Sequence, residues 1–154
     1  MSAPLYDVLV VLHVVSAIVG FGAIAVSGLE ASSGRRSPDP AADESLVAYF
    51  RPGTSWPARS VFLVPVLGLI LLFGGDRSDA SRSWPWIGLA LWVAAMGLAT
   101  GICWPSEHRA QEALATDVPD VARFRQACCR LERGVVLIEV LVVAAVAVMI
   151  LQPA

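Results

Sequence analysis

Four long apolar blocks constrain this chain more than any other feature of its sequence. They cover residues 5–27, 61–75, 84–104 and 134–152. An α-helix rises about 1.5 Å per residue, so about 20 apolar residues cross the ~30 Å hydrocarbon core of a bilayer. Three blocks reach that length alone, and the second reaches it if its flanking residues lie among the lipid headgroups. The blocks therefore predict four transmembrane helices, at about residues 5–27, 58–75, 84–104 and 120–152.

The overall composition agrees with this pattern and favours a membrane protein over an ordinary soluble domain. Of the 154 residues, 56% are apolar or aromatic and 16% are charged, whereas a soluble domain is about half apolar and about a quarter charged. The connections between the blocks are too short for a second domain. We expect one all-α membrane domain over residues 1–154, an up-and-down antiparallel bundle of four helices surrounded by lipid.

The positive charges predict how the bundle is oriented. All 11 are arginines; nine lie in the first and third connections, and only Arg77 and Arg82 lie in the second. Positive residues collect on the cytoplasmic side of a membrane. We therefore expect a multi-pass protein of the bacterial cytoplasmic membrane with both termini outside the cytoplasm. The net charge of −2 gives no basic surface for nucleic acid.

The two cytoplasmic connections differ in their patterns. Residues 28–40 are rich in Gly, Ser and Pro, which predicts a loop, and residues 41–50 predict a short helix on the membrane surface. Asp117 and Pro119 predict the start of the fourth helix, whose first turns stand below the membrane. The cysteines, Cys103, Cys128 and Cys129, fall on this side, where we expect them to stay reduced.

Two ionisable residues lie inside the apolar blocks, His13 in the first and Glu139 in the fourth. Ionisable groups within a membrane are costly and are therefore candidates for function. For His13 a ligand role and a plain hydrogen bond, to Ser16 or to a backbone carbonyl of another helix, are both open. For Glu139 an ion pair with Arg59 is favoured over a place on a proton path.

Small residues predict which helix faces meet. At 100° per residue, Ser16 and Gly20 share a face with His13, which points the histidine into the bundle, because membrane helices approach one another through small residues. Gly97 and Gly101 form a G-x-x-x-G pattern in the third helix and predict a second close contact.

The Leu12-His13 pair, with Gly20 and Gly22 shortly after it in the first of four helices, resembles a signature of the CopD-like bacterial membrane superfamily. That superfamily includes the copper-resistance D proteins, the HemJ type of protoporphyrinogen oxidase and several uncharacterised families. The segment from Pro65 to Gly75 and the ending around Met149 are similar to one of those uncharacterised families. Val19 stands where the relatives commonly have Trp.

The resemblance implies that His13 ligates the iron of a b-type haem in a redox protein. Met96 comes within about 6 Å of the depth of His13 along the membrane normal and is the candidate second ligand of a His/Met pair, but a role as a flexible packing residue is favoured over this one. Two alternatives remain open. One is an accessory or scaffold subunit of an oligomer or larger membrane complex, and the other is a component for small-solute or metal-ion transport.

Overall fold

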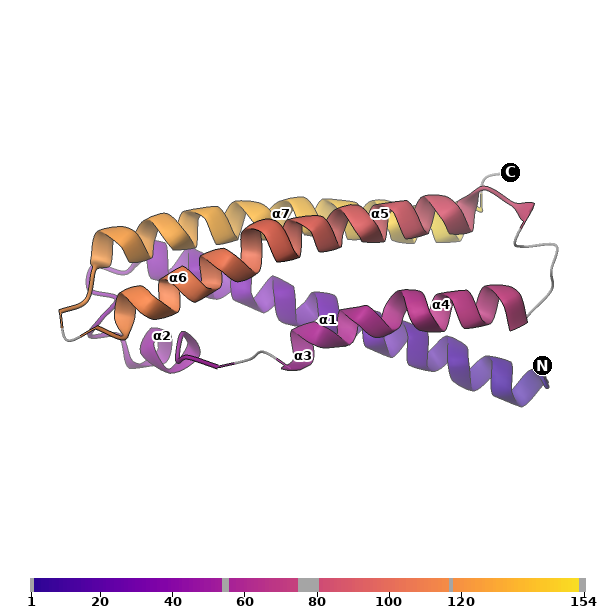
Figure 1. The fold of residues 1–154 in the computed structure, drawn as a ribbon, viewed down its shortest axis with the longest axis horizontal. Coiled ribbons are helices and arrows are strands. Elements are labelled where there is room, and N and C mark those ends of the chain that lie inside the picture. The colour runs from indigo at the N-terminus through magenta and orange to yellow at the C-terminus, as the bar shows by residue number, and fades with distance from the viewer. Residues whose placement is uncertain (1, 54–55, 75–80, 117, 153–154) are drawn as a thin grey trace. The chain divides into compact units, whose positions relative to one another are not determined.

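The structure, a computed structural model, describes residues 2–53, 56–74, 81–116 and 118–152 (Figure 1). Every regular element within these ranges is helical. Four helical segments are long and apolar enough to cross a membrane: Ala3–Arg36, Pro57–Gly74, Trp84–Leu114 and Val121–Leu151. This confirms the prediction of an all-α membrane protein with four spanning helices.

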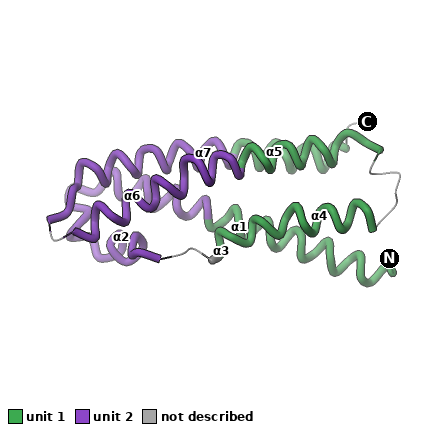
Figure 2. The backbone as a smooth tube through the Cα atoms, in the orientation of Figure 1, with its two compact units in different colours: residues 1–23, 55–95, 140–154 green, residues 24–54, 96–139 purple. Residues whose placement is uncertain are grey.

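The helices have the following bounds in chain order. They are α1 (Ala3–Arg36), α2 (Glu44–Tyr49), α3 (Trp56–Arg59), η1 (Ser60–Phe62), α4 (Leu63–Gly74), α5 (Trp84–Leu98), η3 (Ala99–Cys103), α6 (Trp104–Leu114) and α7 (Val121–Leu151). They form two compact units (Figure 2), each of which takes parts of several helices. Unit 1 comprises residues 1–23, 55–95 and 140–154, and unit 2 comprises residues 24–54 and 96–139.

Unit 1 is built on a close contact between α1 and η1. A Cβ atom added to Gly20 would lie 2.6 Å from the backbone N of Val61, closer than two such atoms can approach. Val61 is itself completely buried, and the hydroxyl of Ser60 donates to the carbonyl of Ser16 over 3.3 Å. The missing side chain of Gly20 therefore lets the two backbones touch.

The opposite face of α1 carries large apolar side chains that stay largely exposed in the described structure. Val15, Ile18, Val19 and Val26 are each between 44% and 66% exposed. Ser16 on the other face is buried. Small buried residues and large exposed apolar residues thus lie on opposite faces of α1, and the exposed face is suited to lipid.

Unit 2 repeats the use of glycine where helices meet. A Cβ atom at Gly28 would lie 2.7 Å from Cγ1 of Val135, and one at Gly34 would lie 2.9 Å from Cε1 of Phe124. Phe124 is fully buried and receives the ring of Phe50 edge-on, at 5.3 Å between centroids. These contacts join α1, α7 and the residues after α2.

These same contacts explain why the predicted loop at residues 28–40 begins too early. α1 continues to Arg36, because Gly28 and Gly34 serve close packing against α7 and do not break the helix. Arg35 then forms an ion pair with Glu132 of α7 at 2.9 Å. The predicted surface helix is present as α2, and Asp43 caps it by accepting from the backbone N–H groups of Ser45 and Leu46.

The third spanning segment also continues past its predicted end at residue 104. A π-helical turn, η3, links α5 to α6, and helical structure runs on to Leu114. Pro105 lacks the N–H group that an unbroken helix needs, and such wider turns accommodate an interruption of this kind. α7 begins after Asp120, whose carboxylate accepts from the backbone N–H of Arg123 at 2.9 Å; Asp117 lies outside the described residues.

Candidate functional site

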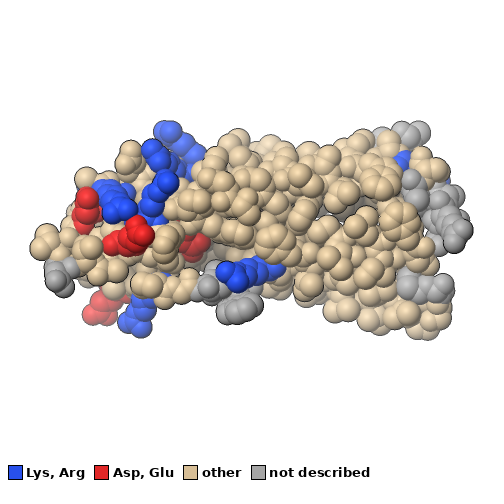
Figure 3. Space-filling view, viewed as in Figure 1, with Lys and Arg blue, Asp and Glu red and all other residues tan. Residues whose placement is uncertain are grey.

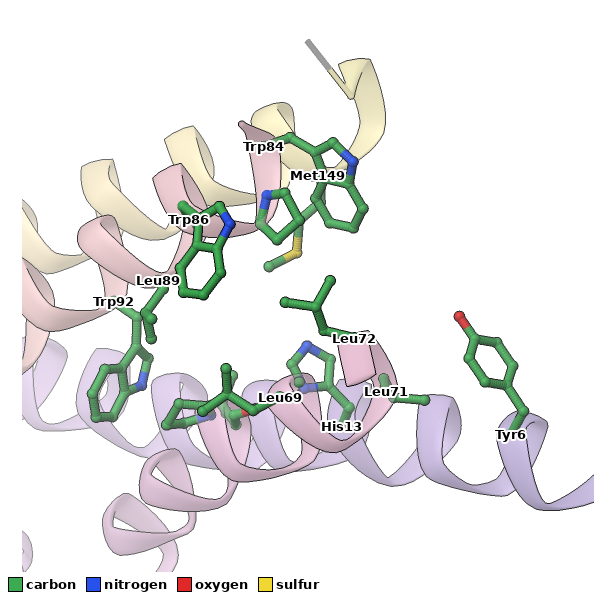
Figure 4. Close-up of a pocket in the computed structure, with 15 residues that line it drawn as sticks. Tyr6, His13, Leu69, Leu71, Leu72, Trp84, Trp86, Leu89, Trp92 and Met149 are labelled. Atoms are coloured by element: carbon green, nitrogen blue, oxygen red, sulfur yellow. Dashed lines mark hydrogen bonds between the residues drawn. The ribbon is translucent and has the colours of Figure 1, made fainter. Parts of the chain in front are cut away.

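A cavity of about 260 Å³ lies within unit 1 and is lined by residues of α1, α4, α5 and α7 (Figure 4). Its walls are almost entirely apolar or aromatic. Three tryptophans line it, together with His13 and Met149. Its size is close to the lower end of the range of small-molecule sites, which are typically apolar cavities with a few polar groups.

His13 enters this cavity from α1, and one hydrogen bond fixes its ring. Nδ1 lies 2.8 Å from the backbone carbonyl oxygen of Val64 in α4. A carbonyl can only accept, so Nδ1 carries the proton and donates, and Nε2 of the neutral ring keeps its lone pair. In Figure 4 the ring points into the cavity. Metal-binding histidines commonly have this arrangement, with the second nitrogen held by a carbonyl.

The sequence of α4 makes room for the histidine. A Cβ atom at Gly68 would lie 3.1 Å from Cε1 of His13, so a larger residue there would press on the ring. Pro65, one residue after the accepting Val64, has no N–H to donate to the carbonyl of Val61. The indole N–H of Trp92 in α5 donates to that carbonyl instead, over 3.2 Å. Gly68 and Pro65 thus place α4 against both α1 and α5.

Met149 of α7 lines the same cavity from another side. Figure 4 shows its thioether and the His13 ring pointing toward the same space from different helices. His13 and Met149 also both line a second, smaller cavity of about 90 Å³ in unit 1. Gly88 of α5 lies beside Met149, because a Cβ atom there would be 3.4 Å from its methyl group. An imidazole nitrogen and a thioether sulfur are thus both present at the cavity as groups that can bind a metal, together with the phenol oxygen of Tyr6.

One polar group at the cavity lacks a partner. The indole Nε1 of Trp84 is buried and has no hydrogen-bond acceptor in the described part of the chain. A buried donor without an acceptor is costly. A ligand with an oxygen acceptor beside Trp84 would therefore gain a hydrogen bond if the indole turned toward it.

The structure shows which of the two hydrogen-bond partners considered for His13 is used. The ring donates to the carbonyl of Val64 and not to Ser16, whose backbone carbonyl instead accepts from Ser60. Ser16 and Gly20 are both buried. They serve the contact between α1 and η1 beside the cavity.

The other candidate residues lie outside this site. Met96 is buried in unit 2, so a pair with His13 would join the two units and stays a prediction. The same holds for the ion pair between Glu139 of unit 2 and Arg59 of unit 1. One carboxylate oxygen of Glu139 is buried without a hydrogen-bond partner in the described residues.

The G-x-x-x-G pattern does not make the expected contact within the chain. Gly97 and Gly101 are exposed, and a Cβ atom added to either would meet no atom of the described structure within 4 Å. Gly134 makes the close contact in this region instead, since its Cβ atom would lie 2.7 Å from Sγ of Cys103. The wider turn η3 begins between the two glycines, so the simple four-residue spacing does not describe one helix face here.

Sequence reasoning missed Met149, Val64 and Gly68 as parts of the site. Met149 was noted only for its family likeness, although its position near the C-terminal end of the fourth helix is compatible with a partner for His13. Val64 contributes a backbone carbonyl, which no side-chain pattern reveals. Among the described residues no group of three His, Cys, Asp or Glu side chains lies close enough to hold a metal ion.

Residues 7–152 match the model of a family described as predicted integral membrane protein (DUF2269). No curated protein and no solved structure matches the chain. The resemblance to the CopD-like superfamily remains a prediction.

Proposed function

We propose that this chain, which belongs to the DUF2269 family of predicted integral membrane proteins, is a redox protein that binds a b-type haem in the cavity of unit 1. The observation that carries this proposal is the bond from His13 to the carbonyl of Val64 at 2.8 Å. It fixes a neutral imidazole with Nε2 free to coordinate, the form that iron requires.

In this proposal Met149 would hold the haem iron together with His13, in place of Met96, the candidate from the sequence. It lines the cavity together with His13, whereas Met96 belongs to unit 2. A His/Met pair is an established haem ligation and raises the reduction potential compared with other ligand sets. The bound haem would supply one-electron chemistry, which the membrane-embedded walls would shield from water.

The lining residues offer a haem apolar and aromatic surface, but few partners for its carboxylates. The tryptophans and leucines offer flat and apolar surface. No arginine in the described part of the chain lines this cavity, so the carboxylates of a haem gain no arginine ion pair there. The unpartnered indole N–H of Trp84 is the donor available to one such carboxylate.

We also propose the orientation that the arginines favour, with both termini outside the cytoplasm of a bacterium. The described arginines outside unit 1 are eight in number: Arg35, Arg36, Arg51, Arg109, Arg123, Arg125, Arg130 and Arg133. This orientation places the first and third connections, which carry most of the arginines, on the cytoplasmic side.

The visible spectrum of the detergent-purified protein, before and after addition of haemin, tests the haem proposal. We expect a Soret band that the His13→Ala variant loses while its helical circular dichroism persists. The matched control is His108→Ala, because His108 is 72% exposed beside Glu112 and far along the chain from the cavity. A wild-type protein without a Soret band after haemin addition would rule out the proposal.

A matched pair of methionine variants separates the two candidate axial ligands. We expect Met149→Ala to shift the Soret band and to lower the reduction potential, because iron would lose its thioether ligand. Met96→Ala should leave both unchanged. The opposite result would return Met96 to the ligand role and exclude Met149.

A further inference from the structure

A separate cavity, distinct from both cavities of unit 1, lies within unit 2 between α6 and α7. It measures about 320 Å³. Three arginines line it, Arg109, Arg130 and Arg133, and its other lining residues are small or apolar: Gly101, Ile102, Ser106, Gly134 and Leu137. We call it the arginine cleft. Figure 3 shows that the arginine side chains of the molecule gather mostly over unit 2. The cleft takes no part in the proposed haem site.

The three arginines of the cleft carry uncompensated charge. Within the described part of the chain none of them makes an ion pair, and no carboxylate lines the cleft. The neighbouring Arg123 differs, because its guanidinium donates to Glu112 at 2.8 Å. The cleft thus offers positive charge to a ligand, where the arginine next to it is already paired.

The positions of the arginines suit one anionic group. Arg130 and Arg133 are three residues apart on α7 and so share a face, and Arg109 reaches the cleft from α6. Arg109 and Arg130 also line an adjoining cavity of about 210 Å³, which extends the basic surface. Guanidinium groups bind phosphate oxygens with paired hydrogen bonds, which makes arginine well suited to recognise a phosphate.

The remaining lining residues distinguish a lipid from a soluble phosphate. Ile102 and Leu137 line the same cleft and are 38% and 52% exposed. Leu137 lies one helical turn beyond Arg133, inside the apolar block that begins at Gly134. The cleft therefore changes from charged to apolar where α7 enters the membrane, and an amphipathic ligand matches both parts.

We propose that the arginine cleft binds the phosphate headgroup of an anionic phospholipid, with an acyl chain along Ile102 and Leu137. Gly134 supports this arrangement, because its missing side chain allows α7 to approach Cys103 and Ile102 and so closes the apolar part of the cleft. Basic pockets between membrane helices on the cytoplasmic side are suited to such headgroups.

Retention of phosphatidylglycerol by the full-length protein tests this proposal. The protein is purified in a neutral detergent, mixed with phosphatidylglycerol or phosphatidylcholine, washed, and assayed for bound lipid and for its thermal unfolding midpoint. We expect phosphatidylglycerol to be retained and to raise the midpoint, and phosphatidylcholine to do neither. Each arginine removed should weaken binding about fivefold, since a basic residue near anionic lipid contributes about 1 kcal/mol.

The decisive variant is Arg130→Gln/Arg133→Gln, and its matched control is Arg36→Gln/Arg51→Gln. Both remove two positive charges from unit 2, but neither Arg36 nor Arg51 lines the cleft. In the first variant, phosphatidylglycerol should no longer be retained or raise the unfolding midpoint, while the midpoint in phosphatidylcholine should equal that of the wild type. In the control variant, phosphatidylglycerol should still be retained and still raise the midpoint. An equal loss in both variants, or retention of the effect in the first, would contradict the proposal.

Inorganic phosphate and glycerol 3-phosphate form a further arm of the same experiment. Both carry the headgroup chemistry without an acyl chain, so we expect neither to raise the midpoint at millimolar concentration. A shift as large as that of phosphatidylglycerol would identify a site for soluble phosphate and overturn the lipid assignment. The Soret band of the protein is measured in parallel, so that failure of the haem proposal is recognised separately.

Discussion

At the scale of single residues, the state of His13 depends on a backbone atom of another helix. The carbonyl of Val64 accepts the Nδ1 proton, so the ring nitrogen that faces the cavity is the one without a proton. Gly68 leaves only 3.1 Å between its own virtual Cβ and the ring. The imidazole is therefore held in one tautomer and one place before any ligand arrives, which reduces the ordering that binding requires.

Asp43 provides a prediction about pH at the same scale. Its carboxylate accepts hydrogen bonds from the hydroxyl of Ser45 and from the backbone N–H of Leu46, and these hold its pKa below the ordinary value. A carboxyl whose folded pKa is lowered stabilises the fold above its unfolded pKa of about 3.9. That contribution is lost as the pH falls through the lower folded pKa.

We therefore expect Asp43→Ala to lower the thermal midpoint at pH 7 and to lose that difference from the wild type at the acid end, as the pH falls through the lowered pKa of Asp43. The measurement is thermal unfolding in detergent from pH 7 down to the lowest pH at which the protein stays soluble. Glu44→Gln is the control, since it also removes one negative charge but leaves the capping carboxylate of Asp43 in place. An equal pH dependence in both variants would show that the cap contributes nothing.

At the scale of the elements, glycine determines where helices touch. Gly20, Gly28, Gly34 and Gly134 each leave less than 3.0 Å between a virtual Cβ and a neighbouring element, whereas Gly97 and Gly101 leave open space. The sequence shows all of them only as small residues within helices. Which of them pack depends on the rotation of each helix about its axis.

One substitution made at two glycines should have opposite effects. Gly20→Ala places a methyl group 2.6 Å from the backbone N of Val61, and such overpacking destabilises by about 1–3 kcal/mol. Gly97→Ala meets open space and should stabilise by up to about 1 kcal/mol, because alanine is the better helix former. Thermal or denaturant unfolding in detergent measures both. A destabilising Gly97→Ala would show that this face packs in an assembly.

The elements also show what the sequence could and could not reveal. The apolar blocks predicted the four spans, because a bilayer requires about 20 apolar residues in each crossing helix. The predicted end of α1 was wrong, because Gly28 and Gly34 look like helix breakers in the sequence. In the structure they allow close contact with Val135 and Phe124 and lie within the helix. His13 was found as a candidate, but its partner Val64 is a carbonyl and carries no sequence signal.

At the scale of the whole molecule, four spanning segments and the uneven arginines make a topology that can be tested. Cysteines introduced at Ser33 and Ser78 should lie on opposite sides of the membrane, with Ser78 outside. The background carries Cys129→Ser, which leaves only Cys103 and Cys128, both buried.

We expect a membrane-impermeant maleimide to label the Ser78 position in intact cells and the Ser33 position only after the cells are opened. Ser33 suits this test because it is exposed near the end of α1. The labelling of the unmodified background gives the baseline. The reverse pattern would place the arginine cleft on the outer side and would exclude the proposed orientation.

The wider turn at Ala99–Cys103 has a consequence for how this family can vary in length. A π-helical turn is equivalent to one residue inserted into an α-helix, and one residue corresponds to a rotation of about 100°. Deleting a single residue there would let α5 and α6 join in phase and would turn Ser106 and Arg109 away from their present directions. Relatives that share the cleft should therefore keep the length of this segment even where its side chains differ.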